Sequence, residues 1–150
     1  MIRRGQVWWV DFGEPKGSKP GYRHPALVLQ RDEVNASRIN TVVVCVLTSN
    51  RSLANAPGNT LLPKRATGLS RDSVANSSQI ATVNKEDLDA LAGTVPPRLL
   101  DRVNEGLRWF LGLDAARGRS DTPAGSLRIG HGEGTTPPSS SVATLAASRR

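Results

Sequence analysis

Short apolar runs alternate with turn-forming and polar segments along residues 5–113. Runs of this length that are rich in valine, leucine and tryptophan are typical of β-strands. We predict strands at residues 6–12, 26–30, 41–47, 59–62, 72–75 and 78–83. The run at 41–47 is almost wholly apolar, which indicates a strand buried on both faces.

Two stretches have the character of helices. Residues 85–91 follow Asn84, a good N-cap residue, and are predicted as a short helix. Residues 97–111 carry apolar side chains at helical spacing, begin with proline and are followed by Gly112. Several short strands with one C-terminal amphipathic helix predict a mainly β protein with some α, in which a small twisted sheet closes into a barrel and the helix covers one side.

Residues 114–150 differ in composition from the rest of the chain. They contain no aromatic residue and few large aliphatic ones. Such a segment cannot bury enough apolar surface to offset the entropy lost on ordering. We therefore predict one folded domain, residues 1–113, and a disordered tail rich in Gly, Ser and Pro at 114–150.

The formal net charge of the chain is +7, which favours a polyanionic partner such as nucleic acid, although a basic chain can also simply be soluble. The single cysteine, Cys45, lies within an apolar run and is interpreted as a buried core residue. No disulfide can form within the chain, which favours the reducing cytoplasm. The sequence shows neither a signal peptide nor a membrane-spanning stretch, so no membrane association is expected.

Candidate chemistry is concentrated at the ends of the predicted strands. The two histidines, His24 and His131, are far apart, and no cysteine–histidine cluster or phosphate-binding fingerprint occurs, so we expect no metal and no cofactor. A basic loop broken by glycines and prolines, residues 15–25, precedes the second strand, and Thr48 follows the third. Loops held by a rigid strand commonly carry binding and catalytic groups.

These residues fit the requirements of metal-independent RNA cleavage. RNA supplies its own nucleophile, the 2′-hydroxyl, so an enzyme needs a base, an acid and donors for the phosphorane. Histidine titrates near neutral pH and suits the proton transfers, whereas arginine stays protonated and suits charge stabilisation. His24, Arg23 and Thr48 would fill these roles. Structural roles also fit: a solvated charge at Arg23, a strand cap at His24, and an ordinary turn at Thr48.

The order of several motifs resembles the MazF/PemK family of toxin endoribonucleases over residues 2–113. The matching segments are 4–11, 17–30, 47–50, 56–59, 67–73 and 101–113. The resemblance implies an SH3-like barrel of the CcdB/MazF type and a homodimer that binds single-stranded RNA, chiefly messenger RNA, across its groove. It further implies products with a 2′,3′-cyclic phosphate and a 5′-hydroxyl, no metal requirement, and inhibition by a cognate MazE-like antitoxin whose C-terminal segment occupies the same groove.

The resemblance also assigns residues. The family's catalytic arginine stands immediately before the proline of the second strand, where this chain has His24, with Arg23 one residue earlier. The family's second catalytic position corresponds to Thr48. Because adjacent strand residues point to opposite faces, the sequence leaves open which of Arg23 and His24 faces the groove.

We predict Arg23, His24 and Thr48 as catalytic. The predicted substrate-binding residues are Lys19, Gly21, Tyr22, Gln30, Ser49, Asn50, Arg51, Asp72 and Gln79. Two other functions stay open: a toxin of the same fold that binds a protein such as a topoisomerase, and a catalytically inactive relative that binds RNA.

Overall fold

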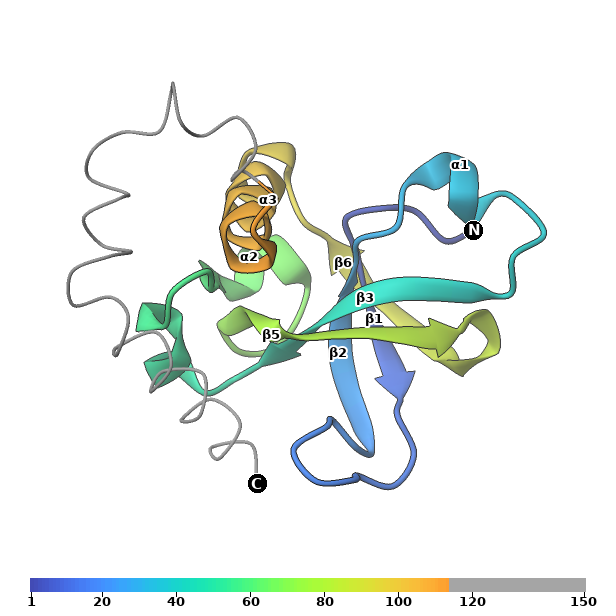
Figure 1. Ribbon diagram of the computed structural model, residues 1–150, viewed down its shortest axis with the longest axis horizontal. Coiled ribbons are helices and arrows are strands. Elements are labelled where there is room, and N and C mark those ends of the chain that lie inside the picture. The colour runs from blue at the N-terminus through green and yellow to red at the C-terminus, as the bar shows by residue number, and fades with distance from the viewer. Residues whose placement is uncertain (114–150) are drawn as a thin grey trace.

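A computed structural model describes residues 1–113, and the predicted disordered tail lies outside the described residues. A strongly curled antiparallel sheet of six strands dominates the fold, and the C-terminal helix packs on one side of it (Figure 1). In chain order the elements are β1 (Gln6–Asp11), β2 (Arg23–Val28), α1 (Asp32–Asn35), β3 (Thr41–Thr48), the 3-10 helix η1 (Arg51–Asn55), β4 (Thr60–Leu62), α2 (Lys64–Thr67), β5 (Ser73–Asn84), the 3-10 turn η2 (Lys85–Asp87), β6 (Leu88–Thr94) and α3 (Pro97–Leu111). Among residues 1–113, no helix has the length and apolar content needed to cross a bilayer.

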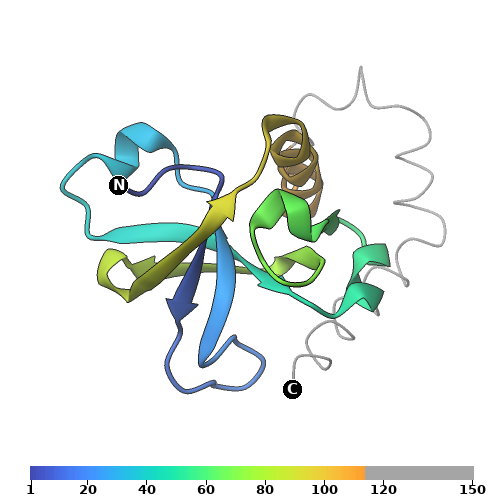
Figure 2. The same ribbon diagram turned by 180° about the vertical axis from the view of Figure 1, so that it is seen from behind.

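The strand order in the sheet is β4-β5-β3-β2-β1-β6. Each neighbouring pair is antiparallel, and β6 comes after β5 in the chain but pairs with β1 at the far side of the sheet (Figure 2). The small curled sheet with a C-terminal helix confirms the predicted fold class. Strand β2 begins at Arg23, so three residues expected in the preceding loop, Arg23, His24 and Pro25, belong to the sheet.

Strand β5 is one continuous strand where the sequence predicts two. Its pairing with β3 advances by two residues from Cys45 to Leu47 but by five from Ala75 to Ile80. The extra residues form a bulge, which bends a strand locally and increases its twist. The polar residues read as a break between two strands are therefore the site of a bend within one strand.

The predicted helix at residues 85–91 is wrong. Only Lys85–Asp87 forms a helical turn, Asn84 makes no side-chain cap, and the chain continues as β6. The register of β6 runs from Leu88 opposite Val10 to Thr94 opposite Gln6. Pairing with β6 satisfies the backbone hydrogen-bonding groups on the second edge of β1. This long-range hydrogen bonding outweighs the local signals for a helix.

The two faces of the sheet bury different apolar clusters. On one face, Val7 and Leu27 pack with Val103 and Leu107 of α3. On the other face, Val10, Ala26 and other residues form a second cluster that α3 does not enter. Helix α3 confirms the prediction for residues 97–111, and its C-cap is a left-handed glycine.

Strand β5 contributes to every buried cluster of the described chain. Ala75 belongs to the cluster beneath α3, Val83 to the cluster on the opposite face, and Val74 packs with Leu53 in a third. The bulge lies between Ala75 and Val83 and allows a single strand to serve all three.

Candidate active site

His24 and Thr48 lie on the same face of the sheet, at strand ends that diverge. The ladder between β2 and β3 ends at the pair Ala26 and Val46, yet β2 begins at Arg23 and β3 continues to Thr48. Paired residues share a face and positions two apart along a strand share it too, so His24 lies on the Ala26 face and Thr48 on the Val46 face. Beyond the last pair the two strands separate (Figure 1).

Arg23 points to the opposite face. Its Nε donates to Asp89 Oδ2 at 2.9 Å, and its guanidinium lies 4.6 Å from the ring centroid of Trp9. Trp9 and Arg23 belong to neighbouring strands whose paired residues, Asp11 and Arg23, share that face. Of the two candidates that the sequence leaves open, His24 lies on the same face of the sheet as Thr48, and Arg23 lies on the opposite face.

The half-buried ring of His24 contacts Phe12. The two ring centroids are 6.4 Å apart and the ring planes are inclined by 57°. Phe12 also lines a hollow of about 790 Å³ between β5 and the loop that joins β1 to β2. We call this space the loop hollow; its other lining residues are Lys16, Ser18, Lys19, Pro20, Ser78, Gln79, Ile80, Ala81 and Thr82.

Two predicted substrate-binding residues, Lys19 and Gln79, meet in the loop hollow. Gln79 is largely buried, and its Nε2 donates to the carbonyl of Ser18 at 3.3 Å, which fixes the loop onto β5. Phe12 and Lys16 are functional candidates that the sequence analysis did not single out. The sequence carries only a weak signal for these two residues, because Phe12 comes next to His24 only once β1 pairs with β2.

The hydroxyl of Thr48 is positioned by the turn that follows it. Thr48 Oγ1 accepts a hydrogen bond from the Asn50 N–H at 3.1 Å, and a hydroxyl that accepts one bond still has its proton to donate. The Asn50 side chain accepts from the N–H of Ser52 at 3.2 Å and from its hydroxyl at 2.7 Å, and so caps η1. Asn50 therefore shapes the turn, while Thr48 keeps a donor for a ligand.

A second, smaller hollow begins at the residue after Thr48. It has a volume of about 380 Å³ and is lined by Ser49, Arg51, Lys64, Ser70, Arg71 and Asp72. We call it the basic hollow, because three cationic side chains face one carboxylate. Asp72 Oδ1 accepts from the backbone N–H of Lys64 at 2.9 Å, which ties the two segments together.

The basic hollow combines three predicted residues, Ser49, Arg51 and Asp72, with Lys64, which the sequence analysis missed. The β4–β5 hairpin pairs Leu62 with Ser73 and thereby brings Lys64 close to Asp72. Nothing in the local sequence around Lys64 indicates this contact.

Gln30 lies beyond the opposite end of β2 from His24. Its Nε2 donates to Asn35 Oδ1 at 2.9 Å and to the Thr41 carbonyl at 3.0 Å, and its Oε1 accepts from the Val43 N–H at 3.2 Å. All polar groups of the amide are therefore engaged in holding the α1–β3 segment. The structure does not bring Gln30 together with the other predicted site residues.

Tyr22 and Gly21 shape the chain immediately before β2. Tyr22 has a φ of +58° and its side chain is 66% exposed. A bulky residue in the left-handed region is strained, and such strain is concentrated at functional sites. A Cβ on Gly21 would lie 2.5 Å from Pro15, so the loop requires glycine there to fold back on itself.

Cys45 takes no part in the site. It is fully buried, and burial raises the pKa of its thiol to about 12, against the smaller opposing effect of a hydrogen bond to the Asn76 backbone. This confirms its interpretation as a core residue, since the thiol stays protonated near neutral pH. Within residues 1–113, no group of three His, Cys, Asp or Glu side chains is arranged to hold a metal ion.

Known proteins resemble this chain in sequence and in architecture. The sequence model of the PemK-like, MazF-like toxins of type II toxin–antitoxin systems matches residues 3–111. Endoribonuclease MazF6 of Mycobacterium tuberculosis is 49% identical over 113 residues, 75% of this chain and 99% of the relative. Endoribonuclease EndoA of Bacillus subtilis is 30% identical over 113 residues, 75% of this chain and 97% of its own length.

A solved structure of a mycobacterial endoribonuclease in complex with its cognate antitoxin superposes with a TM-score of 0.62 at 26% identity, covering 75% of this chain and 97% of that one. The family match covers nearly all of the described residues, and the curled sheet with its C-terminal helix agrees with this neighbour. The chain therefore belongs to the PemK-like, MazF-like toxin family of type II toxin–antitoxin systems, in which the curated relatives named above are endoribonucleases.

Proposed function

We propose that this chain is the toxin endoribonuclease of a toxin–antitoxin pair and that it cleaves single-stranded RNA, chiefly messenger RNA, in the cytoplasm. The observation that carries the proposal is the position of His24 and Thr48 on one face of the sheet, at strand ends flanked by two hollows that contain cationic side chains. A base and a hydroxyl donor with cations on either side are the groups that transesterification of RNA requires.

In the proposed reaction, His24 removes the proton of the RNA 2′-hydroxyl. The 2′-oxygen then attacks the adjacent phosphorus, and the bond from phosphorus to the 5′-oxygen breaks, leaving a 2′,3′-cyclic phosphate. The departing 5′-oxygen takes a proton from water and becomes a hydroxyl, and the hydroxide left behind then takes the proton held by His24, which restores the base. The Thr48 hydroxyl donates to a non-bridging oxygen as negative charge develops there, and the new imidazolium of His24 supplies positive charge nearby.

Arg23 has a positioning role in this proposal. Its contacts with Asp89 and Trp9 connect β2 to β6 and β1 just where β2 begins. An exposed ion pair contributes little to stability, so the expected effect of Arg23 is on the orientation of the neighbouring His24. This assignment differs from the arginine that the family resemblance implies, and it rests on the face to which each side chain points.

The RNA chain would extend from the diverging strand ends into both hollows. Arg51, Lys64 and Arg71 of the basic hollow would bind the backbone phosphates on the Thr48 side, since arginine matches phosphate bidentately. Lys19 and Gln79 would contact the strand on the His24 side, within the loop hollow. The exposed ring of Tyr22 is suited to stacking on an unpaired base.

The proposal includes a homodimer and a cognate antitoxin whose C-terminal segment occupies the RNA groove. Leucines 50–61% exposed at Leu91, Leu111 and Leu113 give the described chain apolar surface for a partner copy. Twofold dimers are the commonest protein assemblies. Sedimentation at micromolar concentration tests the dimer, and the appearance of monomers alone would refute it.

The central experiment measures cleavage of a long single-stranded RNA in EDTA, with analysis of the product ends. We expect cyclic-phosphate and 5′-hydroxyl ends from the natural protein. The His24→Ala variant should lose roughly 10²–10⁴-fold in kcat/KM, as for other general bases. Thr48→Val should lose about 10²-fold, as for other transition-state donors.

The controls separate the roles of the two neighbouring basic residues. Arg23→Ala should keep the shape of the pH–rate profile, whereas His24→Arg should abolish the limb produced by imidazole titration. An inactive Arg23→Ala together with a fully active His24→Ala would overturn the assignment. RNA binding without cleavage by the natural protein would favour an inactive RNA-binding relative instead.

A further inference from the structure

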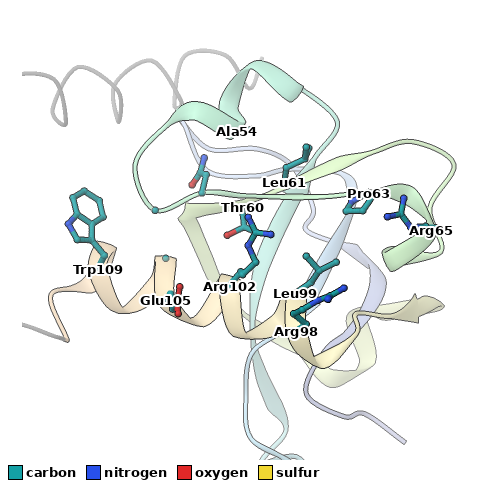
Figure 3. A pocket seen from close by; sticks show the side chains of 13 residues that line it. Ala54, Thr60, Leu61, Pro63, Arg65, Arg98, Leu99, Arg102, Glu105 and Trp109 are labelled. Atoms are coloured by element: carbon teal, nitrogen blue, oxygen red, sulfur yellow. The ribbon is translucent and has the colours of Figure 1, made fainter. Parts of the chain in front are cut away.

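A groove of about 920 Å³ separates α3 from β4 and η1 (Figure 3). It shares no lining residue with the basic hollow or the loop hollow. Its apolar lining includes Leu61, Leu99 and Trp109, and Leu61 and Trp109 are 40% and 39% exposed. Strand β4 is an edge of the sheet, with β5 as its only strand partner among the described residues.

Three arginines line this groove: Arg65 of α2 and Arg98 and Arg102 of α3. Within residues 1–113 the structure records no ion pair or hydrogen bond for any of their guanidinium groups, and all three residues are exposed. The groove contains one carboxylate, Glu105. The excess positive charge of the groove favours an anionic ligand, and guanidinium groups bind carboxylates bidentately.

The spacing along α3 restricts the shape of that ligand. Arg98 and Arg102 are four residues apart on one face of the helix, which is roughly 6 Å along its axis. Trp109 follows on the same face roughly 10 Å further on. An extended peptide advances about 3.3 Å per residue, and only every second side chain points to the same side. The nearest same-side spacings are therefore two residues (about 7 Å) for the two arginines and four residues (about 13 Å) from Arg102 to Trp109, where the long indole side chain spans the difference.

We propose that the groove binds an extended acidic peptide with the pattern acidic–x–acidic–x–x–x–apolar. The two carboxylates pair with Arg98 and Arg102, and the apolar side chain packs on Trp109. The peptide lies along the β4 side of α3, with Arg65 contributing a third positive charge. The proposal rests on this groove alone and does not depend on the catalytic assignment.

The carboxylate of Glu105 favours a peptide over a nucleic acid as the ligand of this groove. It lies along α3 between Arg102 and Trp109 (Figure 3). A nucleic-acid strand carries a charge on every phosphate and would bring one of them against this carboxylate. A peptide can place a neutral residue there, whose backbone N–H can donate to Glu105.

The test is fluorescence anisotropy of a labelled synthetic peptide of this pattern, titrated with the full chain at low salt. We expect saturable binding that weakens as salt is added. Arg102→Glu should raise Kd roughly tenfold or more, because it removes a partner and adds repulsion. The matched control is Arg38→Glu, which makes the same charge change at an exposed position outside the groove and should leave Kd unchanged.

Two further measurements make the test specific. A peptide with its second acidic residue shifted by one position should bind several-fold more weakly, because alternate strand residues point to opposite sides. RNA cleavage by Arg102→Glu should equal that of the natural protein, so that failure of the groove proposal and failure of the nuclease proposal are distinguishable. Melting curves confirm that each variant is folded.

Three results would overturn the proposal. The first is equal binding of the correct and shifted peptides. The second is an oligodeoxynucleotide that binds in place of the peptide and is released by Arg102→Glu, which would assign the groove to nucleic acid. The third is a change of oligomeric state in Arg102→Glu on sedimentation, which would assign it to contact between copies of this chain.

Discussion

Replacing Gly106 with alanine tests how closely α3 is fixed to the rest of the domain. A Cβ at this position would lie 2.3 Å from the carbonyl oxygen of Gly58 and 3.1 Å from its carbonyl carbon. The obstructing atoms are backbone, so the overlap can be relieved only by moving the helix or the turn. On an unconstrained helix the same substitution would stabilise by about 1 kcal/mol.

The two effects have opposite signs, and the structure indicates which is larger. Moving α3 outward loosens the packing of Val103 and Leu107, which are buried beneath it. Overpacking costs about 1–3 kcal/mol, and an overlap of this size against backbone belongs near the upper end. After subtraction of the helix-propensity gain, we expect a net loss of about 2 kcal/mol in the free energy of unfolding.

Guanidinium denaturation and thermal melting provide the assay. A loss of this size should lower Tm by roughly 10 °C in a domain of this length. Glu105→Ala, one residue away on an exposed part of the helix, is the control and should stay within about 0.5 kcal/mol of the natural protein. A Gly106→Ala variant more stable than the natural protein would refute the reasoning, since it would show that the contact with Gly58 is not restrictive.

Three other predictions concern residues away from this contact. Cys45 should resist iodoacetamide at pH 8.5 in the native protein and react in denaturant, because burial raises the pKa of its thiol to about 12. Since only the unfolded thiol ionises at moderately alkaline pH, the free energy of unfolding should fall as pH rises above roughly 8.5. A native Cys45 that is readily alkylated would contradict this prediction. Gln30→Ala should lower the free energy of unfolding by about 1–3 kcal/mol in urea titrations without changing kcat/KM per folded molecule, because the Gln30 amide makes only internal hydrogen bonds. A selective loss of RNA affinity would instead show that Gln30 binds the substrate. Asp89→Asn should change the free energy of unfolding by at most about 1 kcal/mol, because the Arg23–Asp89 pair is exposed, and a larger loss in urea titration would show that the pair has a structural role.

The spacing of apolar residues over short stretches of sequence was sufficient to predict most of the sheet and helix α3. The apolar run at 41–47 became β3, and the helical spacing of 97–111 became α3. The failure at 85–91 has a physical cause, because the stability of β6 comes from pairing with β1, which lies about eighty residues earlier in the chain. No local signal near Leu88 reports that interaction.

The candidate site, too, could be predicted only in part from the sequence. Strand alternation implies that His24 and Arg23 face opposite sides, but only the contacts of Arg23 with Asp89 and Trp9 show which side each one takes. Gln30 sits in a motif that resembles the family, and its hydrogen bonds become visible only once α1 and β3 are in place. The sequence thus identified candidate residues, while tertiary pairing determined which of them meet.

The membership of β5 in all three apolar clusters has a consequence for how the domain opens. A domain whose clusters belong to separate strands can release one part while the rest stays protected. Here, detachment of β5 would expose Val74, Ala75 and Val83 together, so no cluster can lose this strand without affecting the others. Amide hydrogen exchange in β3 and β5 should therefore proceed mainly through global unfolding, with similar protection on both sides of the bulge.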